Sequence, residues 1–300
     1  MQKPTKSTPS AKAWERPVQI LIPYIIIVGI FQLIGFTILG LDPNNFQIPK
    51  TLLQDLVLKL FTLVGTIVVV YLFRWSVDKE SFRSLGFYKK GIWKELIIGL
   101  ALGMALIATG FSLLFLKDEI HWTGTNINIQ NILLGFVLFA FVAFSEELLF
   151  RGYILNNLMK SIPSVYALII CSVSFSLVHG LNPGYNWFSF CNLVLAGLLL
   201  GLPYIYTKSL WLPIALHLSW NFFQGTIFGF SVSGNVTYSL VEQSRSSDNL
   251  WNGGKFGFEG SILSIVLQLI AFMGLWWYYH RKSKGSLVTA IYEQPQSEKL

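Results

Sequence analysis

Long apolar runs separated by short polar connections dominate the chain. Eight runs approach or exceed the length of about 20 apolar residues that a bilayer span requires. They cover approximately Val18–Leu41, Thr51–Phe73, Ile92–Leu116, Ile129–Leu155, Pro163–His179, Trp187–Tyr206, Leu210–Phe228 and Ser261–Tyr279. Backbone groups in lipid must be hydrogen-bonded within their own segment, so each run is predicted to be a helix. The pattern therefore predicts an all-α, polytopic transmembrane helix bundle of about eight spans.

Composition and charge place this bundle in a cell membrane. The chain is 53% hydrophobic and only 12% charged, which excludes an ordinary soluble domain. Its net charge of +7 gathers in alternate connections and at both ends. The positive-inside rule then predicts a multi-pass protein with both termini in the cytoplasm. No basic run with interleaved aromatic residues is present, so the expected partners are the lipid bilayer and a substrate rather than nucleic acid.

The same pattern divides the chain into six parts. We expect, in order, a basic cytoplasmic N-terminal tail (1–17), three spans (18–128), a core that carries buried ionisable residues (129–228), a glycine-rich non-cytoplasmic loop (229–260), a last span (261–280) and a cytoplasmic tail (281–300). Cys171 and Cys191 both lie in apolar runs without a CxxC pair, so we expect them to pack in the interior rather than form a disulfide.

Two adjacent glutamates stand inside the fourth run. A charged side chain at bilayer depth costs at least roughly 2.5–3.5 kcal/mol, so it is rarely present without a partner or a task. Glu147 precedes Arg151 by four residues, in the favourable order for an intrahelical ion pair, and this pair is expected to support the structure. Glu146 has Phe150 at the corresponding position and therefore no such partner, which favours a functional role for its carboxylate.

Helix geometry brings further polar groups to the same interior. Glu146 and His179 lie about 16 and about 17 residues from the turn that joins spans four and five, so both sit roughly 25 Å from it. Phe175 is one helical turn before His179, and His217 and Asn221 share one face of span seven. His217 is only about 9 residues, roughly 13 Å, from its own turn, so span seven must be tilted or sunken to reach the same depth.

This set of groups permits hydrolysis by activated water. A carboxylate paired with an imidazole can take a proton from water and later return it to a leaving amine. A second imidazole and an amide are suitable donors to a developing oxyanion, where one donor is worth roughly 3–4 kcal/mol. The sequence contains no GxSxG motif that would indicate a serine nucleophile.

Three short motifs resemble those of a known family. EELLFR (Glu146–Arg151), FSLVH (Phe175–His179) and HLSWN (His217–Asn221) are similar to the EExxxR, FxxxH and HxxxN motifs of the CAAX-protease and bacteriocin-processing family, also called the Abi family, of intramembrane proteases. The motifs occur in the family's order within roughly Asn131–Gln224, about a third of the chain.

The resemblance implies a glutamate-dependent endopeptidase without a cofactor. In the family, the residues that correspond to Glu146 and His179 activate water, and those that correspond to His217 and Asn221 stabilise the oxyanion. Glu147, Arg151 and Phe175 take supporting positions. The substrate class implied is a peptide or membrane protein, with or without a lipid anchor.

Three alternatives remain open from the residues. Glu146, His179 and His217 could instead be zinc ligands with an open fourth position, although HExxH is absent. The chain could be a non-catalytic membrane scaffold or immunity factor whose motifs are structural. A proton-coupled transporter is disfavoured because the sequence contains no inverted repeat.

Overall fold

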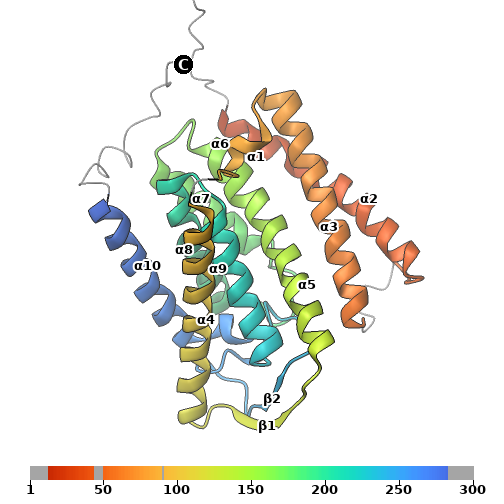
Figure 1. The fold of residues 1–300 in the computed structure, drawn as a ribbon, viewed down its shortest axis with the longest axis vertical. Helices are drawn as coiled ribbons and strands as arrows, with labels where there is room; N and C mark the ends of the chain where they lie inside the picture. Colours follow the sequence, from red (N-terminus) through yellow and green to blue (C-terminus); the bar gives the residue numbers. More distant parts are fainter. Residues whose placement is uncertain (1–12, 44–49, 90, 283–300) are drawn as a thin grey trace, which may run out of the picture.

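The computed structural model describes residues 13–43, 50–89 and 91–282, and it is a bundle of helices with one small sheet (Figure 1). The predicted all-α, polytopic bundle is confirmed. Most of each predicted terminal tail lies outside the described residues. The helices are α1 (Arg16–Gln19), α2 (Leu21–Ile38), α3 (Leu52–Phe73), α4 (Ile92–Leu116), α5 (Ile129–Glu147), α6 (Asn156–Leu158), α7 (Ser164–Leu177), α8 (Trp187–Thr207), α9 (Trp211–Asn221) and α10 (Ile262–Lys282).

Shorter elements interrupt or join these helices. Three of them are π-helical turns that continue α3, α5 and α9: η2 (Arg74–Asp78), η4 (Leu148–Leu155) and η5 (Phe222–Ile227). The others are the 3₁₀ turns η1 (Ala13–Glu15), η3 (Phe82–Leu85), η6 (Gly254–Phe256) and η7 (Phe258–Gly260), and the strands β1 (His121–Thr125) and β2 (Val241–Ser244).

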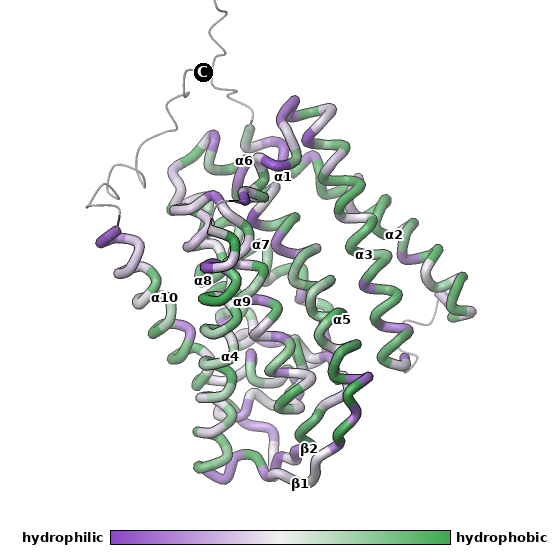
Figure 2. The backbone as a smooth tube through the Cα atoms, viewed as in Figure 1, coloured by the Kyte–Doolittle hydropathy of each residue, from purple (hydrophilic) through white to green (hydrophobic). Residues whose placement is uncertain are grey.

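All eight predicted runs are helical, but they differ in length. Within the described residues, six helices are long and apolar enough to cross a membrane, whereas α7 has 14 residues and α9 has 11. Every residue of α9 from Leu212 to Asn221 is buried, whereas only two residues of α2 and five of α10 are buried. Figure 2 shows hydrophobic positions along the outer helices and hydrophilic ones gathered at helix ends. The seventh run is therefore an internal helix surrounded by the others.

Glycines on α4 allow α9 to lie in the centre. Gly99 and Gly103 form a GxxxG pair, the spacing that lets two membrane helices approach closely. A Cβ atom on Gly103 would lie 2.7 Å from the Cβ of Ser219 and 2.8 Å from the backbone nitrogen of Trp220. A Cβ on Gly99 would meet the α9 backbone at 2.8 Å. The missing side chains thus set the position of the helix that carries the HLSWN motif.

Gly103→Val is expected to lower the free energy of unfolding by about 1–3 kcal/mol, because an overpacked helix contact forces backbone shifts. Gly274→Val on α10 is the matched control, since no atom lies within 4 Å of its Cβ position. Thermal unfolding of the detergent-purified proteins measures both. Equal stability of the two variants would contradict close packing of α4 on α9.

The two ends of the bundle differ. We call the end that holds α1, η2 and α6 the α6 end, and the opposite end, with β1 and β2, the sheet end (Figure 1). The two strands pair antiparallel. This sheet was not predicted, and it shows that the glycine-rich loop 229–260 is folded against the segment before α5.

Charged residues form a network at the α6 end. The Asp78 carboxylate accepts from Arg74 at 2.9 Å and lies 3.2 Å from Arg16. Glu80 bonds to Arg74 at 2.6 Å and to Lys160 at 2.5 Å. These contacts connect three segments that are distant in sequence, so basic residues predicted to share one side of the membrane lie at one end.

The Glu80 carboxyl makes this network sensitive to acid. Burial raises its pKa, but the hydrogen bond and charge of Lys160, with the charge of Arg74, outweigh burial and hold the pKa below the ordinary 4.5. A lowered folded-state pKa stabilises the folded protein above the unfolded-state value, and this contribution is lost as the pH falls through the folded-state value. Unfolding temperatures between pH 7 and pH 3.5 should therefore fall more steeply for the wild type than for Glu80→Gln; parallel curves would contradict the contribution.

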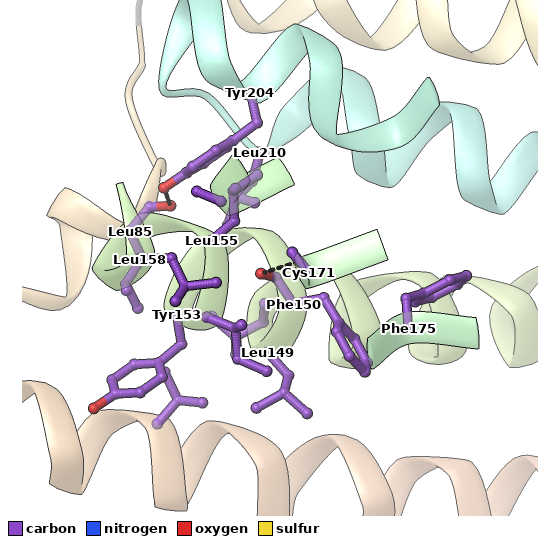
Figure 3. Close-up of a cluster of buried hydrophobic side chains, with 14 of the residues drawn as sticks. Leu85, Leu149, Phe150, Tyr153, Leu155, Leu158, Cys171, Phe175, Tyr204 and Leu210 are labelled. Atoms are coloured by element: carbon purple, nitrogen blue, oxygen red, sulfur yellow. Dashed lines mark hydrogen bonds between the residues drawn. The ribbon is translucent and has the colours of Figure 1, made fainter. Parts of the chain in front are cut away.

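A hydrophobic cluster packs η4 against α7. Figure 3 shows Phe150 and Phe175 side by side and the Cys171 thiol bonded to the Phe150 carbonyl. That Sγ–O distance is 3.2 Å, and the Phe150 and Phe175 rings meet edge to face at 5.2 Å between centroids. Cys171 is buried and Cys191 half-buried, and neither forms a disulfide. The cluster fixes the two helices whose ends carry Glu146 and His179.

Candidate active site

The two glutamates stand where α5 changes into a π-helical turn. Glu146 and Glu147 are the last residues of α5, and η4 follows directly. π-Helical turns inside α-helices occur frequently at functional sites because they redirect side chains without ending the helix. The Glu146 side chain is 27% exposed and lines a cavity, whereas the Glu147 side chain is fully buried. Neighbours in sequence thus face different surroundings.

The Glu146 carboxylate faces two imidazoles from two other helices. Its Oε2 atom lies 3.8 Å from Nε2 of His217 and 3.9 Å from Nε2 of His179. These distances exceed a direct hydrogen bond and match a gap that one water molecule can bridge. Within the described residues, Oε2 has no hydrogen-bond partner. The arrangement leaves a carboxylate oxygen and two ring nitrogens directed at one point.

The second nitrogen of each ring is held by an acceptor. Nδ1 of His179 lies 2.8 Å from the carbonyl oxygen of Phe175, and Nδ1 of His217 lies 2.8 Å from Oε1 of Glu147. A carbonyl oxygen and a carboxylate only accept, so both Nδ1 atoms carry a proton. Each Nε2 atom is thereby turned toward Glu146, and this fixes the orientation of both imidazoles.

Glu147 joins the ion pair to the imidazole. Its Oε1 atom accepts from Arg151 at 2.7 Å and from His217 at 2.8 Å. The ion pair expected from the i,i+4 spacing is present. Arg151 also donates to the carbonyl of Gly197 on α8 at 3.2 Å. The chain of contacts from Gly197 to His217 locks α5, α8 and α9 together behind the site.

Phe175 packs against three of these groups. The Arg151 guanidinium carbon lies 4.6 Å from the centre of its ring, in a cation–π contact. The ring centroids of His179 and His217 lie 5.0 and 6.2 Å away. The first aromatic residue of the FSLVH motif therefore separates the buried cation from the two imidazoles.

A cavity of about 790 Å³ connects the site with the rest of the bundle. Asn221, one turn beyond His217, lines it together with Glu146, His179 and His217. It extends past α5 to α2 and α3, where its polar lining comprises Tyr24, Gln32, Asp55, Lys59 and Thr62. The space is large enough for several residues of an extended peptide.

The loop after η3 explains how His217 reaches the depth of Glu146 although it lies only a few turns from the start of span seven. The backbone N–H of Leu210 donates to the carbonyl of Gly86 at 3.1 Å, and the Trp211 indole donates to the carbonyl of Tyr88 at 2.9 Å. The segment after η3 thus lies over the start of α9. Because α9 begins beneath this loop, a short helix brings His217 to the depth of Glu146.

The residues proposed as zinc ligands do not form an evident metal site. In the described ranges, no group of three or more His, Cys, Asp or Glu side chains is arranged to hold a metal ion. The Glu146 carboxylate lies close to both rings. The gap between this carboxylate and the two Nε2 atoms has a size that suits one water molecule.

Comparison with known proteins identifies the part of the chain that builds this site. Residues 128–223 match the family model described as type II CAAX prenyl endopeptidase Rce1-like. The resemblance to the CAAX-protease family is confirmed. This Rce1-like segment covers α5, η4 and α6 to α9, and it contains all three motifs. The match supports an intramembrane protease of this kind. No match was found among curated proteins.

Several side chains outside the motifs also line the cavity at this site. Trp220 stands between His217 and Asn221, and Glu259 comes from the loop before α10. On the other side, the Tyr24 hydroxyl of α2 lies 3.1 Å from the Thr66 hydroxyl of α3. The sequence signal that could have identified Tyr24 is its position as a residue with a polar group inside an apolar run. Glu259 carried no such signal, because its loop was expected to be irregular.

Proposed function

We propose that the protein is an intramembrane endopeptidase of the glutamic type, in which Glu146 and His179 activate water. One observation carries this proposal: Oε2 of Glu146 lies at water-bridging distance from Nε2 of both His179 and His217. A water molecule in that gap can donate one hydrogen to the carboxylate and the other to the unprotonated Nε2 of His179. Its oxygen lone pair then faces the cavity in which a peptide would lie.

Hydrolysis follows from these positions. The water oxygen attacks the peptide carbonyl carbon while Glu146 takes the proton. The oxygen of the tetrahedral intermediate becomes negative, and His217 can donate to it through Nε2 because Glu147 balances a doubly protonated ring. Asn221 offers an amide donor from the same face of α9. When the carbon–nitrogen bond breaks, Glu146 returns the proton to the leaving amine.

The proposal extends to orientation and substrate. We place the α6 end and both termini in the cytoplasm, because Arg16, Arg74, Lys160 and Lys208 gather at that end. The substrate is a peptide or membrane protein, with or without a lipid anchor, which enters the cavity between the helices. No cofactor takes part in the steps given above.

A comparison of protein termini in cell membranes tests the function. Cells that contain wild-type protein are expected to yield peptide termini that are missing when Glu146→Gln is present at the same level. Glu242→Gln, an exposed glutamate on β2, is the matched control and should leave the termini unchanged. Identical termini in the wild type and Glu146→Gln would refute a protease and favour a scaffold.

Chelation separates the proposed mechanism from a zinc-dependent one. Cleavage by the purified protein should survive incubation with EDTA, because the carboxylate and imidazoles activate water directly. Activity that disappears in EDTA and returns with added zinc would instead assign Glu146, His179 and His217 as metal ligands.

A further inference from the structure

A buried carboxylate outside the three motifs also lines the cavity. Glu259, in η7, is 6% exposed and bonded through both oxygens. Its Oε1 accepts from the Trp220 indole N–H at 3.1 Å. Its Oε2 accepts from the backbone N–H of Ser233 at 2.7 Å and from the Ser233 hydroxyl at 2.8 Å. One carboxylate thus accepts two hydrogen bonds from within the glycine-rich loop and one from α9, which ties the loop to that helix.

The hydrogen bond from Trp220 to Glu259 matters because Trp220 lies beside two residues of the site. It precedes Asn221 and follows His217 by three residues, so it belongs to the helical turn that carries both groups. Its ring packs against Phe258, the residue before Glu259, with 6.0 Å between centroids. The anchored indole restricts rotation and sliding of α9 at the turn where His217 and Asn221 face the cavity.

The loop side of the contact is held in an unusual backbone conformation. Ser233 has φ +46°, a left-handed value that non-glycine residues rarely adopt. The carboxylate occupies both donors of this residue. Close backbone approaches at Gly257 support the same fold, since a Cβ there would lie 2.0 Å from the Ser231 carbonyl oxygen. The loop is therefore rigid where it bonds Glu259.

We propose that Glu259 is a positioning residue for the HLSWN turn: through Trp220 it holds His217 and Asn221 in register with Glu146, and through Ser233 it closes the sheet end of the cavity. The role rests on the proposed function. Hydrogen bonds to a charged acceptor are shorter and stronger than those between neutral groups, which suits a contact that must fix a helix within a fraction of an ångström.

Two single substitutions and their combination test the coupling. Glu259→Gln should lower kcat about tenfold or more with little change in KM, because a small displacement of catalytic groups costs turnover rather than binding. Trp220→Phe should act in the same way. The double variant should be no slower than the more impaired single variant, because both remove one interaction. If the double variant instead loses kcat by the product of the two single losses, Glu259 and Trp220 act independently and the assignment is refuted.

A control separates positioning from folding of the loop. Asn252 is fully buried in the same loop, donates to the Ser247 carbonyl at 2.8 Å and has no bond to α9. Asn252→Ala should lower the unfolding temperature and leave kcat per folded molecule unchanged. A loss of kcat equal to that of Glu259→Gln would mean that any damage to the loop suffices, and the proposal would fail.

A spectroscopic measurement makes the proposal independent of protease activity. The ¹⁵N-labelled indole resonance of Trp220, assigned by its absence in Trp220→Phe, should shift in Glu259→Gln and also in an inactive Glu146→Gln background. If the shift occurs but the wild-type protein cleaves no peptide, the contact stands and the proposed function fails. If the resonance does not move while the wild type cleaves peptides, the function stands and the role of Glu259 is overturned.

Discussion

Glu146→Gln is expected to lower the rate of peptide cleavage about a thousandfold or more and to leave the protein folded. Glutamine keeps the shape of the side chain but cannot take a proton from water. Because Oε2 of Glu146 has no hydrogen-bond partner among the described residues, the exchange breaks no direct hydrogen bond of that oxygen. Initial rates and thermal unfolding on the same detergent-purified samples measure both effects.

His179→Ala provides the companion measurement. Among the described residues, the ring makes a direct hydrogen bond to the carbonyl of Phe175, and its side chain is 13% exposed. Its removal should therefore abolish cleavage at modest cost in stability. Wild-type rates in both Glu146→Gln and His179→Ala would refute the assignment of this site. A loss of rate accompanied by unfolding in both would show instead that the two residues serve the fold.

The sequence was sufficient for the spans because lipid imposes a simple rule. A helix that faces hydrocarbon must be apolar over its whole length, so hydropathy locates helices such as α3 and α4 within a few residues. The rule is weaker for α9, which touches protein on every side. Its position is set by the loop that covers its start and by the close approach to Gly99 and Gly103 on α4, which hydropathy does not reveal.

Spacing along the sequence predicted part of the site but not the hydrogen bonds that join its helices. The distance along one hairpin was enough to expect Glu146 and His179 at one depth, and i,i+4 spacing was enough for the pair of Glu147 and Arg151. The bond between His217 and Glu147 depends on how closely α5 and α9 approach, although α6, α7 and α8 separate them in sequence. No periodicity carries that information.

The structure of the glycine-rich loop could not be predicted from the sequence either. β1 and β2 are only five and four residues long and more than a hundred residues apart, so neither has enough alternation to be predicted. Glu259 lies in a segment whose fold depends on positive φ angles at Gly253, Gly254 and Gly257. Its carboxylate could be placed in the cavity only after that backbone was known.

Arg151→Met is expected to lower the free energy of unfolding by about 3–5 kcal/mol, the usual result when one partner of a buried ion pair is removed. Both side chains of the pair are fully buried, and Arg151 also loses its bond to Gly197 and its contact with Phe175. Lys160→Met is the matched control. Lys160 and Glu80 are 29% and 37% exposed, and such pairs contribute little.

Combining Arg151→Met with Glu147→Met then separates structure from catalysis. The double variant leaves no buried charge unpaired, so it should recover much of the stability that either single variant loses. It should remain inactive, because His217 has lost the carboxylate on Nδ1 that orients its ring and balances its charge. Thermal unfolding and initial rates decide the matter. A stable, active double variant would show that Glu147 serves only the fold, and that His217 reaches Glu146 without its help.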